Sequence, residues 1–388
     1  MWQPPAGLTL SLLATLAGCQ SAETWGFVAT LGSDTTSVER VTRQGNQVVG
    51  EAVGRSPVVV HRRWTATFAA DGSLRRWTMD SHIPNAPPGE TDLHHSLDFS
   101  GDTVRVVRQA GADSIDRNVI IGYQPTVPWN AFLYSTLEAL LQAARDRPDS
   151  VRIGQYFFEG WAEGHFGYAE LRRLGSGEVS FSSTGLAGSG RARVDEQGRL
   201  VSYSGDGTTY KQEVRRITQV PEIGLLVERF AAAERSSGFS RWLSPRDTMR
   251  ASVGAAAVTV DYSRPLVRGR TLVGGLIPYD EVWRTGANAA TQLGVSAPVR
   301  LAGVLLPAGT YTLWTLPTHQ GVDLIINRQT GQWGTEYRSS QDVARRPMSV
   351  ATPPAPVERF TIRVDSASAR LVMEWGTFRW SAPIEDTH

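Results

Sequence analysis

Short runs of alternating apolar and polar residues, separated by turn residues, extend from Trp25 to about Ile217. This period of two is typical of antiparallel strands that bury one face. The longest run, Val58 to Phe68, is soon followed by Asp71 and Gly72, a pair that accepts the left-handed backbone of a tight hairpin turn. A similar strand, acidic-Gly turn and strand recur at Val194–Leu200. The pattern therefore predicts a meander of antiparallel strands.

One segment in this region has the spacing of a helix. We expect a helix over residues 129–146, begun by Pro128 and ended by Pro148. It would lie in the concave face of a curved antiparallel sheet, so residues 25–220 are expected to form a β-meander domain with one packed helix. The helix either completes the core or acts as a lid or plug over an apolar cavity, and in the second case the domain would be a carrier of apolar molecules. Its apolar positions recur every three to four residues, at Phe132, Leu133, Leu137, Leu140 and Leu141.

A second helical pattern runs from Pro221 to Arg235 and is followed by Ser236-Ser237-Gly238. We interpret residues 221–243 as a helical linker, with a domain boundary near residue 240.

Strand patterns resume after Pro245, with turn signals at intervals typical of a sandwich. The clearest turn is Pro307-Ala308-Gly309. Residues 244–388 therefore predict a β-sandwich of about seven or eight strands, closed by a C-terminal hairpin, which makes the whole chain mainly β. The expected strands are Ala256–Tyr262, Ala290–Val295, Thr310–Leu316, Val322–Asn327, Val357–Val364 and Ala369–Trp375.

The same region carries several motifs in a fixed order. Together they closely resemble the bacterial domain-of-unknown-function family 2911 over about residues 244–384. The resemblance implies an envelope-associated protein with a β-rich module, and it implies no activity. The motifs are Val260–Pro265, Arg268–Arg270, Gly274–Tyr279, Glu281–Asn288, Pro307–Leu313, Ile326–Asn327 and Gln332–Tyr337.

The N-terminus has the form of an export signal. Leu8 to Ala17 is apolar but too short to span a bilayer, and it runs into Leu16-Ala17-Gly18-Cys19. This resembles the lipobox of bacterial lipoproteins, which implies that residues 1–18 are a signal peptide and that Cys19 is lipidated. Gln20 is not the aspartate associated with retention at the inner membrane, so the resemblance favours the outer membrane. No Lys or Arg precedes the apolar run, a departure from the family pattern, and an ordinary secreted protein is the alternative.

The composition of this chain of 388 residues limits the kinds of partner that it is expected to bind. The formal net charge is +1, which gives no reason to expect nucleic acid or an acidic membrane surface. The single cysteine excludes an intramolecular disulfide. No second apolar run is long enough to cross a bilayer, so we expect membrane attachment through the lipid alone and an otherwise extracytoplasmic chain.

The C-terminal region holds the densest group of side chains typical of binding sites. Trp, Tyr and Arg dominate binding hot spots because they combine contact area with a polar group. We expect a pocket for a polar ligand, a glycan or peptide, or a surface for an envelope partner. Alternatively the indoles fill the core and Arg284 pairs with Asp261 or Glu336. The candidate ligand-binding residues are Tyr262, Arg264, Arg268, Trp283, Arg284, Asn288, Trp333, Glu336 and Tyr337.

Catalytic signals are weaker. A nucleophilic triad needs a histidine, and the C-terminal region offers only His319 and His388. Asp261 with Glu281 or Glu336 is the pair that a glycan hydrolase would use. We therefore expect a binding protein rather than an enzyme, with no assigned catalytic residue and no cofactor.

One N-terminal patch has the side chains of a metal site, namely His82, Asp92, His94 and His95. The spacing matches no metal motif, and we interpret the patch as solvated loop histidines without a metal. The Gly-rich stretches at 185–190 and 205–207 lack a following helix, which a phosphate-binding loop requires.

Overall fold

The computed structural model describes residues 22–55, 58–87, 92–111, 113–121, 126–130, 132–157, 166–184, 188–208, 211–236 and 244–387. The expected signal peptide, Cys19 and the domain boundary near residue 240 lie outside the described residues.

Within these residues, the N-terminal region forms one sheet of fifteen strands, in the order β8-β7-β6-β5-β4-β3-β2-β1-β15-β14-β13-β12-β11-β10-β9. Strands that follow one another in sequence are paired, as expected for a meander, except that β1 pairs with β15 and that β8 and β9 lie at opposite edges of the sheet. All pairs are antiparallel except β9 and β10. The strands are β1 (Glu23–Leu31), β2 (Asp34–Gln44), β3 (Gln47–Arg55), β4 (Val59–Phe68), β5 (Leu74–His82), β6 (Asp92–Ser100), β7 (Thr103–Ala110), β8 (Asp113–Ile120), β9 (Thr126–Trp129), β10 (Ser150–Phe157), β11 (Phe166–Gly175), β12 (Glu178–Ser183), β13 (Gly188–Val194), β14 (Leu200–Thr208) and β15 (Glu213–Ile217).

The two acidic-Gly turns are confirmed. Gly72 joins β4 to β5 with φ +81°, and Gly198 joins β13 to β14 with φ +75°. A side chain is strained in this left-handed region, which explains why glycine occupies both positions.

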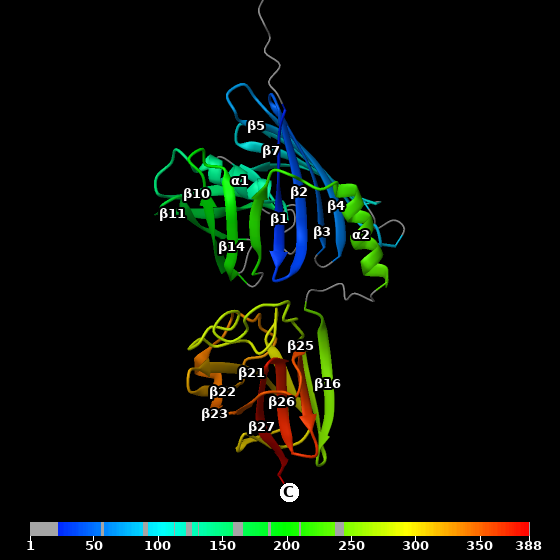
Figure 1. The fold of residues 1–388 in the computed structure, drawn as a ribbon, viewed down its shortest axis with the longest axis vertical. Coiled ribbons are helices and arrows are strands. Elements are labelled where there is room, and N and C mark those ends of the chain that lie inside the picture. Colours follow the sequence, from blue (N-terminus) through cyan, green and yellow to red (C-terminus); the bar gives the residue numbers. More distant parts are fainter. Residues whose placement is uncertain are drawn as a thin grey trace, which may run out of the picture.

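Helix α1 (Tyr134–Ala143) lies within the bend of the sheet, as Figure 1 shows. The expected packed helix is thus confirmed, but it is shorter than residues 129–146. Residues 126–129 instead form β9, which runs parallel to β10 at the edge of the sheet. Pro128 is tolerated there because β9 is an edge strand. One side of its backbone has no neighbouring strand, so the missing N–H of proline breaks no hydrogen bond on that side.

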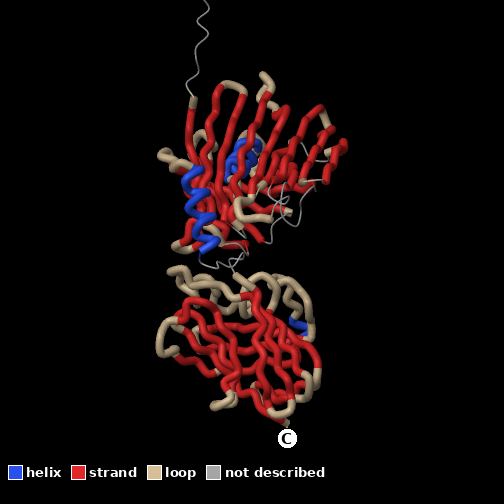
Figure 2. The backbone as a smooth tube through the Cα atoms, turned by 90° about the vertical axis from the view of Figure 1, so that its right-hand side faces the viewer, coloured by secondary structure: helices blue, strands red, loops and turns tan. Residues whose placement is uncertain are grey.

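Helix α2 (Ile223–Ser236) packs on the opposite face of the same sheet (Figure 2). Alternation along β1 separates the two faces: Phe27 and Ala29 pack with α1, whereas Val28 packs with α2. The helix expected as a linker therefore buries an apolar stripe, including Ile223 and Phe230, against β2, β3 and β4.

In residues 244–387 two sheets of six strands stack on one another. The first has the order β16-β17-β18-β21-β22-β23; the second has β20-β19-β27-β26-β25, with β24 paired to β27. All six expected strands are present, and β26 and β27 make the expected C-terminal hairpin. The structure adds further strands that are short or mostly exposed and so carry little alternation, which makes the sandwich larger than the seven or eight strands expected. The strands are β16 (Arg246–Val253), β17 (Ala256–Ser263), β18 (Thr291–Val295), β19 (Val299–Leu301), β20 (Val304–Leu306), β21 (Gly309–Thr318), β22 (Gly321–Asn327), β23 (Asp342–Pro347), β24 (Ser349–Ala351), β25 (Val357–Asp365), β26 (Arg370–Gly376) and β27 (Phe378–Asp386), with a short 3₁₀ helix at Ser339–Gln341.

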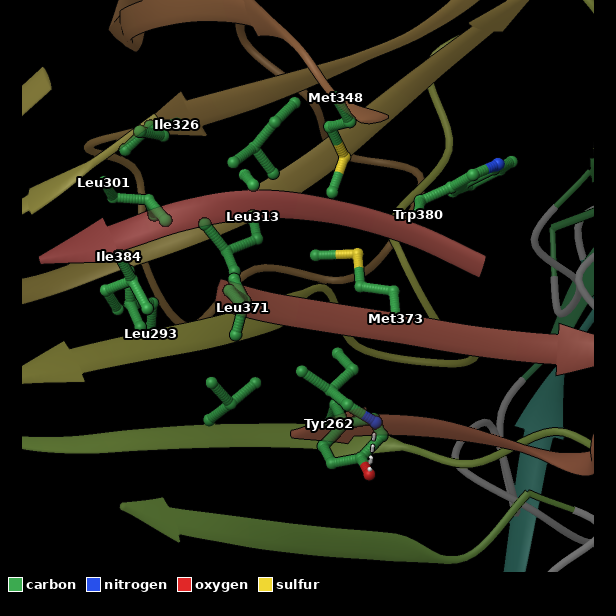
Figure 3. Packing of buried hydrophobic residues seen from close by; sticks show 14 of the residues in the cluster. Tyr262, Leu293, Leu301, Leu313, Ile326, Met348, Leu371, Met373, Trp380 and Ile384 are labelled. Carbon is green, nitrogen blue, oxygen red and sulfur yellow. Dashed lines mark hydrogen bonds between the residues drawn. The ribbon is translucent and has the colours of Figure 1, made fainter. Parts of the chain in front are cut away.

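The sandwich core is filled by large side chains from both sheets, part of which Figure 3 shows. Trp283 stacks on Trp375 at 5.9 Å between ring centroids and meets Phe360 and Trp380 edge to face. The hydroxyl of Tyr262 accepts a hydrogen bond from the Ile362 N–H at 3.0 Å. Close packing of this kind leaves the indoles no contact with a ligand.

The two regions touch at the turn between β1 and β2. The Ser33 N–H donates to the Arg268 carbonyl at 3.0 Å, and the Arg268 guanidinium pairs with Asp34. A Cβ at Gly32 would overlap the Arg268 carbonyl, so the contact depends on glycine there.

Candidate functional site

A cavity of about 600 Å³ lies between α1 and the concave face of the N-terminal sheet. Its lining is largely apolar and includes the aromatic side chains of Trp77, Phe68 and Phe99. The same lining includes exposed residues, among them Gly72, Ser73 and Arg75 at the turn between β4 and β5. The cavity therefore reaches solvent at this turn. The full lining is Arg43, Ala66, Phe68, Gly72, Ser73, Leu74, Arg75, Trp77, Phe99, Gly101, Thr126, Val127, Pro128, Thr136, Ala139, Gln142 and Ala143.

Trp77, which lines this cavity, stacks on Trp64, which lines a smaller cavity beside it. Trp64 and Trp77 lie 4.4 Å apart between centroids and are inclined by 9°. Trp64 pairs across the strands with Gly50, where a Cβ would overlap its indole ring. A glycine thus makes room for the flat indole pair, which gives the cavity a rigid aromatic wall.

A second cavity of about 120 Å³ adjoins the first. The two share Arg43, Ala66, Phe68, Trp77, Ala139 and Gln142 in their linings. The smaller one also has a polar end, formed by Glu23, Glu138, Arg199 and Arg216. The combined hollow therefore has an apolar body and one charged end.

Glu39 on β2 holds the first turn of α1. It is completely buried and accepts hydrogen bonds from the Ser135 N–H at 3.0 Å, the Ser135 hydroxyl and the Trp64 indole N–H. The first turn of a helix has unpaired N–H groups, and α1 has no capping side chain of its own. Burial raises the pKa of Glu39 to about 7. The hydrogen bonds from Ser135 and Trp64 limit this rise, because they stabilise the charged carboxylate.

Glu138 holds α1 one turn later. Its carboxylate pairs with Arg216 on β15 and accepts from the Leu200 N–H at 2.8 Å. Burial raises its pKa, while Arg216 opposes that shift. Both carboxylates are thus engaged in fixing the helix to the sheet, and they do not form the open cleft that a glycan hydrolase needs.

The nine predicted ligand-binding residues do not converge on one pocket. Tyr262 and Trp283 are in the sandwich core, at 2% and 8% exposure. Arg264 binds Asp247, the Phe360 carbonyl and the Thr361 hydroxyl.

Arg268 and Tyr337 are engaged elsewhere. Arg268 pairs with Asp34 in the contact between the two regions. The hydroxyl of Tyr337 donates to Asp342 at 2.6 Å and accepts from Arg345 at 2.8 Å. Burial raises the pKa of Tyr337 to about 12.

The other four residues come from two neighbouring loops. Ala289 and Trp333 form a β-bridge, and the Gly334 N–H donates to the Asn288 carbonyl at 3.0 Å. Arg284 lies against Gly334, and the exposed Glu336 follows in the same turn as Trp333. The sequence left open a pairing of Arg284 with Asp261 or Glu336. Among the described residues neither pair forms, and Asp261 pairs with Arg246 instead.

The histidine patch is divided between two faces. His82 binds Asp92 at 2.7 Å and His94 binds Asp80 at 2.6 Å, while His95 is fully buried. Consecutive residues of a strand point to opposite faces, which separates His94 from His95. Among the described residues, no group of three or more His, Cys, Asp or Glu side chains is arranged to hold a metal ion.

The fold defines a mainly β protein with two regions, a bent sheet enclosing a helix and a stacked sandwich. Residues 244–384 match the model of a family described as a protein of unknown function, DUF2911. The resemblance stated from the C-terminal motifs is therefore confirmed.

No curated protein matches the chain. Among solved structures, a DUF1089 family protein from Pseudomonas aeruginosa is 18% identical, with a TM-score of 0.33 over 45% of this chain and 92% of that one. A beta-barrel-like protein of domain of unknown function DUF1849 from Brucella abortus is 9% identical, with a TM-score of 0.34 over 52% of this chain and 97% of that one. These scores support no conclusion about function.

Sequence reasoning missed the residues that shape the cavity, notably Trp77, Ala139 and Glu39. Alternation marks Trp77 as facing inward, but it does not reveal whether the space beyond is filled. Glu39 carried one weak signal, since in an alternating strand it lies on the same face as the apolar Val41. Among the described residues, no helix has the length and apolar character to cross a membrane.

Proposed function

We propose that the N-terminal region binds an apolar molecule in the cavity beneath α1, and that the protein acts as a carrier for it. The cavity of about 600 Å³ carries this proposal. Ligand sites usually measure about 300–1,000 Å³ and are lined by apolar and aromatic side chains with few polar groups. The aromatic side chains of Trp77, Phe68 and Phe99 match that description, and α1 adds the small Ala139 and Ala143 with the polar Thr136 and Gln142.

The expected ligand is an acyl chain or a fused ring system. Burial of each methylene contributes about 0.8 kcal/mol, and association costs at least about 4 kcal/mol. Roughly fifteen or more buried carbon atoms are therefore needed for micromolar affinity. In this proposal α1 is the plug that the ligand displaces or packs against.

Cavity filling tests the proposal. Ala139 lines both hollows, and Ala139→Trp places an indole inside them. We expect this variant to bind a fluorescent apolar probe, N-phenyl-1-naphthylamine, at least about tenfold more weakly, which corresponds to about 1.4 kcal/mol.

The matched control is Leu225→Trp, which adds an indole on the exposed side of α2, where Leu225 is 66% exposed. Its probe affinity should equal that of the unmodified protein. Equal affinity in the Ala139→Trp variant, with its fold retained by circular dichroism, would contradict the proposal.

We further propose that the protein is exported and attached to the outer membrane through a lipid on Cys19. The support is the lipobox-like Leu16-Ala17-Gly18-Cys19 after a short apolar stretch. Labelled palmitate supplied to cells should be incorporated into the protein and lost in Cys19→Ser, while Ser21→Ala keeps the label. A labelled Cys19→Ser protein would contradict the proposal.

A further inference from the structure

Two loops of the sandwich leave the first sheet at neighbouring points. Thr291, where β18 begins, pairs with Leu313 on β21, and Asn327, where β22 ends, pairs with Thr312. The loop before β18 and the loop after β22 therefore start side by side. They stay together through the Ala289–Trp333 bridge.

Arg284 lies in the first of these loops without a counter-charge. Its side chain makes no hydrogen bond or ion pair with any residue that the structure describes, and its Nε atom is shielded from solvent. Burial is the only cause that lowers its pKa, to about 10. A nearby carboxylate would oppose that lowering, so neither Glu336 nor any other described acid neutralises the guanidinium.

The loop also holds strained backbone. Thr285 has φ +53° and Asn288 has φ +59°, and the first is a β-branched residue that is disfavoured there. Strain of this kind persists where the surrounding structure enforces it, and it concentrates at ligand sites. The enforcing contacts are visible: the Thr291 hydroxyl donates to the Thr285 carbonyl at 2.6 Å, and Gly334 donates to the Asn288 carbonyl.

Free recognition groups surround Arg284. Trp333 is 40% exposed, although indoles usually lie inside. The side-chain amide of Asn288 has no partner among the described residues and is part-exposed. Arg284 itself is part-exposed, and its stem rests on Gly334, where any Cβ would overlap it. A charge, an amide and an aromatic face are thus available on two loops that are paired with one another.

We propose that Arg284, Asn288 and Trp333 form a binding site for a small carboxylate that carries an apolar face. Arg284 supplies the positive charge and donors that suit a carboxylate. The Asn288 amide donates to the same group or to a neighbouring oxygen, and Trp333 packs against the apolar face. The site belongs to the sandwich and does not depend on the N-terminal cavity.

The proposal reduces the nine residues expected from the sequence to three. The others are in the core, paired with neighbours, or, in the case of Glu336, of the wrong charge. A carboxylate with an apolar face occurs at a peptide C-terminus and in a sugar acid, so the test includes both sources.

The first test separates a binding role from a structural one. If Arg284 binds a ligand, its uncompensated burial opposes folding, so Arg284→Met should keep or raise the melting temperature of the protein. If Arg284 stabilises the loops, the same change should lower it by several degrees. Arg300→Met on β19, at an exposed position of the same region, is the matched control.

The second test measures binding by calorimetry, with N-acetylphenylalanine and glucuronate as acid probes at millimolar concentration. N-acetylphenylalaninamide and glucose are their neutral counterparts. We expect one acid to bind at least about tenfold more tightly than its neutral counterpart, and the difference to vanish in Arg284→Met but not in Arg300→Met.

Trp333→Leu should weaken the same acid without abolishing its preference over the neutral probe. The acid that binds identifies the source of the carboxylate. The proposal is overturned if neither acid binds, if acid and neutral probe bind equally, or if Arg284→Met leaves the preference intact.

Discussion

The two regions bury aromatic residues in opposite ways. In the sandwich, Trp283, Trp375 and Trp380 interlock between two sheets. In the bent sheet, Trp64 and Trp77 stack on one another and leave about 600 Å³ open beside Trp77. Two facing sheets supply side chains from both sides, whereas one helix of three turns cannot fill the concave face of a fifteen-stranded sheet. The difference shows that the partner layer, more than the strand sequence, decides whether a cavity remains.

The largest effect should come from truncating an indole in each region. Trp283→Ala opens a hole in a close-packed core and should reduce the free energy of unfolding by about 3–5 kcal/mol. Trp77→Ala enlarges a space that already exists and should cost about half as much. Urea unfolding followed by circular dichroism measures both, and equal losses would remove the contrast between the two regions.

The next effect concerns the anchoring of α1. Glu39 has a folded-state pKa of about 7 against an ordinary value of 4.5. Below pH 4.5 the group is protonated in both states; as pH rises toward 7 the unfolded chain ionises first, so stability falls. We expect a loss on the order of 3 kcal/mol between pH 4.5 and 8, confined to the N-terminal region.

Glu39→Gln is the variant that isolates this effect. It keeps an acceptor for the Ser135 N–H but cannot ionise, so its unfolding free energy should vary less with pH than that of the unmodified protein. A pH dependence equal in both proteins would show that Glu39 does not titrate in this range.

The smallest effect should arise where the two regions meet. Asp34 is 39% exposed on its side chain and pairs with the buried Arg268. Asp34→Asn should cost about 1 kcal/mol or less, because solvent screens the exposed partner. Calorimetry should show the two regions unfolding with more widely separated transitions. No change in their separation would mean that the backbone bond from Ser33 to Arg268 is sufficient.

Local patterns predicted most of the fold. Period-two alternation indicated the strands, and the acidic-Gly pairs predicted two hairpins that Gly72 and Gly198 make with positive φ. The start of α1 was predicted too early because Pro128 is compatible both with a first helical turn and with an edge strand. Only the pairing of β9 with β10 shows that residues 126–129 form an edge strand and not the first turn of the helix.

The candidate sites were predictable to a smaller extent. The C-terminal group contained Arg284, Asn288 and Trp333, but six other residues of the same chemical types stood with them. Burial of Tyr262 and Trp283, and the pairing of Arg264 with Asp247, depend on residues distant in sequence. Residue type alone cannot separate a core indole from a ligand-contacting one.

By itself the sequence determined the mainly β class, the places of the turns and both helices, and the family of residues 244–384, because these depend on side-chain periodicity, backbone preference and ordered motifs. Tertiary structure alone decided that a hollow remains under α1, that Glu39 anchors this helix and that no acid in the described part of the chain pairs with Arg284. Each of these depends on which distant atoms fill or fail to fill a given volume, and no local pattern records that.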